Sequence, residues 1–269
     1  SRPAHSLRRV LRSLFVEEAS TDEAENDALL PVVDLTPFFR EGSEFEEQRE
    51  RVIEVLSQQC ERVGFLQVTW DGLPWDVVEA AHASARSFFE LPPEEKRRAS
   101  KAAVKTPSSS YISTGFRGTG ESEYNKLRES WSCTNPAHDP SDPSVASDPF
   151  YASESGRKHF AQAPDPQVPW PPNLPGFRDA ITRYYQLCEQ TARVLHIALA
   201  HCMGAKEEDC LRLTSRHHSS LNLYTFAPAA SQQHDSAAGD VLPAHGDITT
   251  VTVLTHDMSR YAEGARNLE

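Results

Sequence analysis

The stretch that most constrains the fold is FRDAITRYYQLCEQTARVLHIALAHCMG, residues 177–204. Its apolar residues recur at the three- and four-residue spacing of an amphipathic helix. No other segment of the chain shows this period over such a length, so the sequence predicts one long helix here. The apolar positions that define it are Phe177, Ile181, Tyr184, Leu187, Cys188, Thr191, Val194, Leu195 and Ala198.

The other periodic segments are shorter. Helical spacing predicts helices at 41–64, where Gly64 gives a stop signal, and at 73–92, before Pro92-Pro93. β-branched, aromatic or alternating residues predict four strands, at 31–35, 65–70, 219–226 and 251–255. In the strand at 219–226, Leu221, Leu223 and Thr225 alternate with Asn222, Tyr224 and Phe226. Because the long helices mostly precede the strands, we expect an α+β protein whose sheet is a barrel or jelly roll.

Charge and composition limit the function classes. Among 269 residues the formal net charge is −12, so nucleic acid is not an expected partner. No apolar run reaches the roughly 18–20 residues that a membrane span needs, so we expect no membrane partner either. The five cysteines are scattered, which indicates reduced thiols in a cytoplasmic setting. The arginine-rich stretch 1–14 fits a frayed helix or the remnant of an organelle-targeting peptide.

A histidine and an aspartate precede the last predicted strand. His245 and Asp247 are two residues apart, so in an extended chain their side chains point to the same face and can bind one ion. Imidazole and carboxylate are the ligands of the non-haem Fe(II) facial triad, which needs one further histidine. With 11 histidines and 39 acidic residues, about one or two such pairs arise by chance, and the alternative is a surface loop before a strand.

A set of ordered motifs resembles one protein family. Residues 30–257 resemble isopenicillin-N-synthase-like members of the Fe(II)/2-oxoglutarate-dependent oxygenases, with the motifs in the order of that family. Besides the long helix, the segments that carry the resemblance are PVVDLTPF (31–38), QCERVGFLQVTWDGLP (59–74), ARSFFELPPEEK (85–96), YISTGFRGTG (111–120), KLRESWSC (126–133), LNLYTF (221–226) and HGDITTVTVLTHD (245–257).

The resemblance implies a double-stranded β-helix (jelly-roll) core with a helical N-terminal region and a long supporting helix. It implies Fe(II), 2-oxoglutarate and O₂, and hydroxylation, desaturation or ring closure of a small organic substrate. His245 and Asp247 would ligate the iron, Tyr224 would contact the 2-oxoglutarate carboxylate, and Asn222 would lie nearby. The alternative for Tyr224 is a core aromatic residue with a satisfied hydroxyl group.

The same resemblance divides the chain into five parts. They are a basic then acidic extension (1–30), an N-terminal oxygenase region (31–132), a proline-rich loop or insertion (133–175), the long helix with the start of the oxygenase core (176–257) and an unmatched tail (258–269). We expect the charged segment 93–101 to be solvated, and Thr252 and Leu254 to pack in the barrel wall.

The chain departs from the family pattern after Asp257. The family's second ligand histidine and its 2-oxoglutarate-clamping arginine have no counterpart in MSRYAEGARNLE, and the last strands are missing. We therefore expect a fragment of an active oxygenase. The alternative is a catalytically silent binding or regulatory protein that lacks the third iron ligand.

Overall fold

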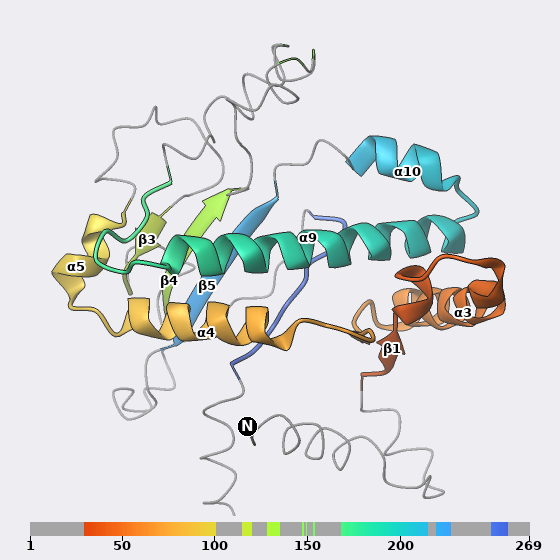
Figure 1. Cartoon of the computed structure of the whole chain (residues 1–269), viewed down its shortest axis with the longest axis horizontal. Helices are drawn as coiled ribbons and strands as arrows, with labels where there is room; N and C mark the ends of the chain where they lie inside the picture. Colours follow the sequence, from red (N-terminus) through yellow and green to blue (C-terminus); the bar gives the residue numbers. More distant parts are fainter. Residues whose placement is uncertain are drawn as a thin grey trace, which may run out of the picture.

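The structure is a computed structural model that describes residues 30–100, 115–119, 128–134, 147, 149, 153, 168–214, 219–226 and 249–257. In chain order the assigned helices and strands are β1 (Val32–Asp34), η1 (Thr36–Phe38), η2 (Ser43–Phe45), α3 (Glu46–Arg62), β2 (Gln67–Thr69), α4 (Trp75–Phe89), α5 (Pro93–Arg98), β3 (Gly115–Arg117), β4 (Arg128–Thr134), α9 (Phe177–Cys202), α10 (Glu207–Thr214) and β5 (Ser220–Phe226). The helices α4 and α9 lie in front of the sheet β3-β4-β5, and β1 lies beside α3 (Figure 1).

Helix α9 is the element against which the other helices pack. It has 26 residues and begins after Gly176, whose φ of 90° lies in the region that glycine adopts without strain. Helices α3, α4 and α10 all contact it, and α4 runs alongside it in front of the sheet (Figure 1). The predicted long helix at 177–204 is therefore confirmed, with its end two residues earlier than the sequence indicated.

The apolar residues of α9 pack in two hydrophobic clusters. Residues of its first half, including Ile181 and Tyr185, pack with Phe88 of α4 and with Trp131 of β4. Its second half contributes Val194, Leu195 and Ala198 to another cluster that contains Val33, Leu35 and Leu56. One rigid helix thus holds the α4–sheet unit and the α3–β1 unit in a single arrangement.

The antiparallel sheet has the order β3-β4-β5. Trp131 of β4 pairs with Phe116 of β3 and Leu223 of β5, and its side chain is completely buried. Since side chains alternate along a strand, Trp131, Cys133 and Leu221 share the face that packs on the helices. The alternation that predicted the strand at 219–226 is confirmed, and it leaves the opposite face of the sheet to polar residues.

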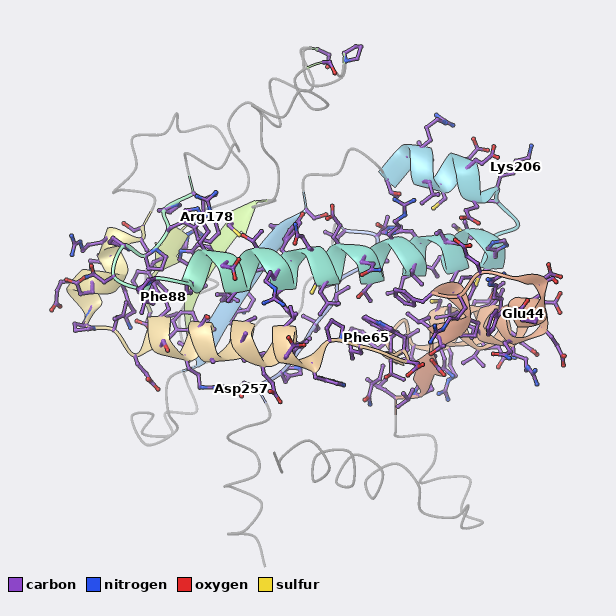
Figure 2. All side chains as sticks on the ribbon, in the orientation of Figure 1. Glu44, Phe65, Phe88, Arg178, Lys206 and Asp257 are labelled. Carbon is purple, nitrogen blue, oxygen red and sulfur yellow. The ribbon has the colours of Figure 1, made fainter. Side chains whose placement is uncertain are left out.

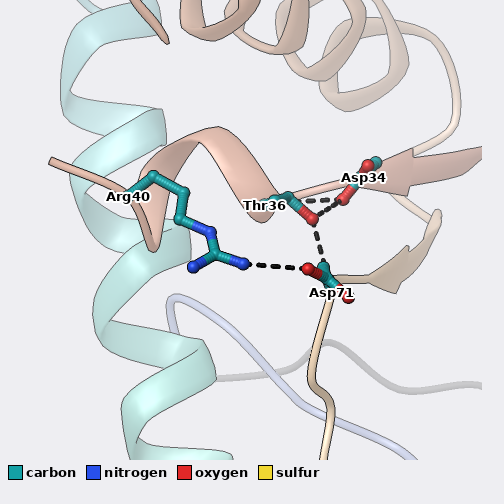
Figure 3. Close-up of polar contacts among 4 residues, drawn as sticks. All are labelled: Asp34, Thr36, Arg40 and Asp71. Atoms are coloured by element: carbon teal, nitrogen blue, oxygen red, sulfur yellow. Dashed lines mark hydrogen bonds and ion pairs between the residues drawn. The ribbon is translucent and has the colours of Figure 1, made fainter. Parts of the chain in front are cut away.

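A second, parallel pair joins β1 to β2, with α3 between them along the chain. α3 ends at Arg62, and two residues later the N–H of Gly64 donates to the carbonyl of Gln59, so the predicted stop is confirmed. After β1 the Asp34 carboxylate accepts a hydrogen bond from the Thr36 N–H at 2.9 Å, and Thr36 Oγ1 accepts one from the Asp71 N–H at 2.8 Å (Figure 3). The first motif of the sequence is thus a corner that links β1 to the loop after β2.

One expectation about local structure holds only in part, and another is wrong. In the segment 93–101, of which residues up to 100 are described, the expected solvent exposure holds for Glu94, Arg97 and Arg98 but not for Lys96, which is buried on helix α5 against Glu129. Residues 251–255 form no strand, and no described strand is hydrogen-bonded to them. Thr252 is exposed and Leu254 is 67% exposed, so neither side chain packs in a barrel wall.

Several predictions fall outside the described residues. They concern residues 1–29, most of the proline-rich loop at 133–175, and the tail from residue 258 onward. The end of that loop is described: Val168 is buried, and Pro169 accepts a hydrogen bond from the Trp131 indole N–H at 3.3 Å. No helix in the described part of the chain is long and apolar enough to cross a membrane.

The buried Lys96 gives a test of the fold. Its Nζ lies 2.6 Å from Glu129 Oε2 and donates to the Phe89 carbonyl at 3.1 Å. Lys96→Met leaves the Glu129 carboxylate without its cation on the apolar side of the sheet, and we expect it to lower the free energy of unfolding by about 2–3 kcal/mol. Urea denaturation measures this change.

The matched control is Arg98→Met, on the same helix. Arg98 pairs with Glu95 at 3.1 Å, and its side chain is 55% exposed, so its loss should cost less than about 1 kcal/mol. Equal losses for the two variants would contradict the assigned role of Lys96.

Candidate functional site

The polar face of the β3-β4-β5 sheet carries the two predicted co-substrate residues. Asn222 and Tyr224 lie on alternate positions of β5, opposite Ser132 and Ser130 of β4 in the strand register. Arg128 precedes Ser130 by two residues on the same face of β4. The face therefore presents hydroxyl, amide, phenol and guanidinium groups, whereas Glu129 lies on the other face with Trp131.

Two contacts cross from β4 to β5 on this face. The Ser132 hydroxyl donates a hydrogen bond to Asn222 Oδ1 at 2.7 Å. The Arg128 guanidinium lies over the Tyr224 ring, 4.1 Å from its centroid. Tyr224 is 44% exposed, so the alternative of a core aromatic residue is wrong. Both predicted residues are thus on the surface of the sheet and in contact with polar partners.

Residues 249–257, which follow the predicted iron ligands, lie against α4 and α9. At the start of the segment the Thr250 hydroxyl is 2.7 Å from His196 Nε2, while His196 Nδ1 contacts the Ala192 carbonyl. At its end Asp257 forms a part-buried ion pair with Arg86 of α4, near the lower edge of that helix in Figure 2. The path of the chain from Thr250 to Asp257 is therefore set by side chains of two helices.

Thr255 is the central contact of this segment. Its hydroxyl is 2.6 Å from the Tyr184 hydroxyl of α9 and 3.0 Å from His82 Nε2 of α4. Burial lowers the pKa of His82, and the nearby Arg86 and His256 act in the same direction while Asp257 opposes them. Burial also raises the pKa of Tyr184, which stays a neutral hydrogen-bonding phenol.

The predicted iron ligands, His245 and Asp247, lie outside the described residues. Within the part of the chain that is described, no three His, Cys, Asp or Glu side chains gather to hold a metal. The donor set that the sequence offers, an imidazole and a carboxylate, suits Fe(II). The donor-rich polar face suits a dicarboxylate, because hydroxyl, amide and guanidinium N–H groups all bind carboxylate oxygens.

Sequence reasoning missed four residues of this region: Arg128, Ser132, Arg86 and Thr255. The alternation in LRESWSC places Arg128, Ser130 and Ser132 on one face. This alternation is the signal that could have indicated Arg128 and Ser132. Arg86 and Thr255 have no such signal. Their partners are more than seventy residues away in the chain, so only the packed structure brings them together.

Comparison with known proteins agrees with this geometry. Residues 30–155 match the family described as the N-terminal region of the non-haem dioxygenase in morphine synthesis. A 2-oxoglutarate-Fe(II) type oxidoreductase of Metarhizium rileyi is 28% identical over 85% of this chain. A bi-functional coumaroyl CoA and feruloyl CoA ortho-hydroxylase of Ipomoea batatas is 26% identical over 90% of it. These matches show that the chain is similar to the Fe(II)/2-oxoglutarate-dependent oxygenases.

Solved structures show the same fold. A 2OG-Fe(II) oxygenase family protein from Caulobacter crescentus superposes with a TM-score of 0.50 at 21% identity, covering 73% of this chain and 55% of that one. A full-length Neurospora crassa protein, solved in complex with α-KG, also gives 0.50, at 16% identity, over 78% of this chain and 54% of that one. The fold expected from the sequence, with a jelly-roll core, is therefore confirmed. The chain spans 56–60% of the length of the two curated relatives.

The environment of His82 predicts how the stability of this protein depends on pH. The pKa of His82 is below its ordinary value of 6.5 in the folded state, so the unfolded chain binds the proton more readily. The contribution of His82 is therefore fully present above pH 6.5 and is lost as the pH falls below it. His82→Gln keeps a hydrogen-bonding partner for Thr255 but removes the titration.

We expect the parent to lose more stability than His82→Gln between about pH 7.5 and about pH 5. Thermal denaturation at several pH values measures the difference, and His201→Gln, at the exposed end of α9, controls for loss of another imidazole. A larger loss in His82→Gln than in the parent would contradict this assignment.

Proposed function

We propose that this protein oxidises a small organic substrate as an Fe(II)/2-oxoglutarate-dependent dioxygenase, by hydroxylation, desaturation or ring closure. His245 and Asp247 serve as iron ligands, and Asn222 and Tyr224 contact 2-oxoglutarate. The observation that carries the proposal is the polar face of the sheet, where Asn222 and Tyr224 stand side by side on β5.

The chemistry of that face supports a dicarboxylate ligand. Among the described residues of β4 and β5 whose side chains point to this face there is no carboxylate, whereas Arg128 supplies a cation and Asn222 and Tyr224 supply neutral donors. A carboxylate placed here would meet N–H and O–H groups without repulsion from an acid. This matters in a chain whose overall charge is −12.

The segment after the predicted ligands supports the metal part of the proposal. Its contacts with His196, Tyr184, His82 and Arg86 fix the chain from residue 250 to Asp257. Ligands on a flexible chain lose coordination geometry, and anchoring of the supporting residues restores it. Residues 249–257 thus form a fixed segment that begins two residues after Asp247 in the chain.

The roles of the protein residues follow from their chemistry. When bound, Fe(II) with 2-oxoglutarate and O₂ supplies the oxidising power that the side chains lack. The Tyr224 hydroxyl and the Asn222 amide donate to a co-substrate carboxylate and set its orientation, while His245 and Asp247 hold the metal. Positioning of this kind lowers the barrier by aligning the reacting groups before the reaction begins.

Anaerobic titration of the protein with Fe(II) and 2-oxoglutarate tests the proposal. We expect a visible metal-to-ligand charge-transfer band in the parent, because the α-keto carboxylate chelates the bound iron. His245→Ala should abolish the band by removing an iron ligand. His201→Ala, which replaces an exposed histidine at the end of α9, should leave it unchanged.

Absence of the band in the parent would overturn the proposal. It would favour a catalytically silent binding or regulatory protein with the same fold, in which the polar face of the sheet serves another ligand.

A further inference from the structure

The orientation of the Asn222 amide is set by a neighbouring strand. Ser132, which is buried, donates its hydroxyl hydrogen to Asn222 Oδ1 at 2.7 Å. An amide has one acceptor end and one donor end, and this contact occupies the acceptor end. Among the described residues, the Nδ2 group reaches Ser220 Oγ, at 3.5 Å, the outer limit of a hydrogen bond. Asn222 therefore presents its NH₂ group to whatever lies above the sheet.

The ring of Tyr224 is held by a different β4 residue. Arg128 is only 6% exposed, and its guanidinium lies 4.1 Å from the ring centroid. A cation within about 6 Å of an aromatic face is attracted by the ring quadrupole, more strongly where water is excluded. Because the Tyr224 side chain is on the open surface of the sheet, the stacked guanidinium restricts the directions in which its hydroxyl can point.

We propose that β4 positions the two co-substrate-binding residues of β5: Ser132 orients the Asn222 amide and Arg128 orients the Tyr224 ring, so that both present donors to a carboxylate of 2-oxoglutarate. This inference rests on the proposed function and adds to it two residues that act through Asn222 and Tyr224.

A purely structural role makes a different prediction. Cross-strand pairs stabilise a sheet by roughly 0.2–1 kcal/mol whatever binds to it. If Ser132 and Arg128 only join β4 to β5, their replacement lowers the midpoint of thermal unfolding but leaves the affinity for 2-oxoglutarate unchanged. If Ser132 and Arg128 are positioning residues, replacing them lowers the affinity for 2-oxoglutarate. The loss occurs only when the β5 residue that each one orients is still present.

The Ser132 arm uses isothermal titration of the Mn(II)-loaded protein with 2-oxoglutarate. Ser132→Ala should weaken binding about two- to tenfold, the range expected for loss of one hydrogen bond. Ser132→Thr keeps the hydroxyl and should restore the parent affinity. In the Asn222→Ala background, Ser132→Ala should have no further effect. Ser87→Ala is the matched control, because it also removes a serine hydrogen bond, to Ala83 in α4.

The Arg128 arm follows the same design. Arg128→Met should weaken binding about two- to fivefold, as expected for loss of one cation–π contact, and Arg128→Lys should recover part of it. In the Tyr224→Phe background, where the ring remains without its hydroxyl, Arg128→Met should have no further effect. Arg178→Met is the control, because Arg178 lies over the Trp170 ring at 5.6 Å on another part of the molecule.

The possible outcomes separate the inference from the proposed function. No binding of 2-oxoglutarate by the parent overturns both. Parent binding that is weakened by Asn222→Ala and Tyr224→Phe, but not by Ser132→Ala or Arg128→Met, overturns the positioning role and leaves the function standing. The positioning role is also overturned if Ser132→Ala and Arg128→Met lower the affinity for 2-oxoglutarate equally in the parent and in the Asn222→Ala and Tyr224→Phe backgrounds. Losses that vanish in the Asn222→Ala and Tyr224→Phe backgrounds establish it.

Discussion

Burial of one helix stripe holds the described molecule together. The stripe on α9 fills the core beneath the β3-β4-β5 sheet with its first half and the core beside α3 and β1 with its second half. Burying a large apolar side chain stabilises the fold by about 1.5–3 kcal/mol, so the residues of this stripe together outweigh any single polar contact. The placement of the sheet, of α4 and of the segment 249–257 all depends on this helix.

Strand β4 links the packing of the core to the polar face of the sheet. Its apolar positions, Trp131 and Cys133, fix one face of the sheet against the helices, and alternation then fixes what the other face presents. Trp131 is completely buried, so a shift of β4 by one residue would expose it and bury Ser130 or Ser132 in an apolar core. The register that places Ser132 beside Asn222 is thus enforced by hydrophobic burial on the opposite face.

Some of this could be predicted from the sequence and some could not. The alternation in residues 220–226 correctly separated Asn222 and Tyr224 from Leu221 and Leu223, because period two is a local property of a strand. The charged segment 93–101 is largely exposed as expected, but the burial of Lys96 could not be predicted, since its partner Glu129 is distant in the chain and lies on another element. Residues 251–255 have strand-forming residues, but a strand needs a hydrogen-bonded neighbour, and none is described beside them.

The sequence alone determined the long helix, the polar and apolar faces of β5, and the similarity to the Fe(II)/2-oxoglutarate-dependent oxygenases. Each of these features depends on periodicity or on ordered motifs, which involve residues that are close together in the sequence. Only the tertiary structure decided that Arg128 stacks on Tyr224, that Ser132 binds Asn222, and that Thr255 meets both His82 and Tyr184. These contacts join residues far apart in the chain, and their geometry follows from the packing of α4, α9 and the sheet around a common core.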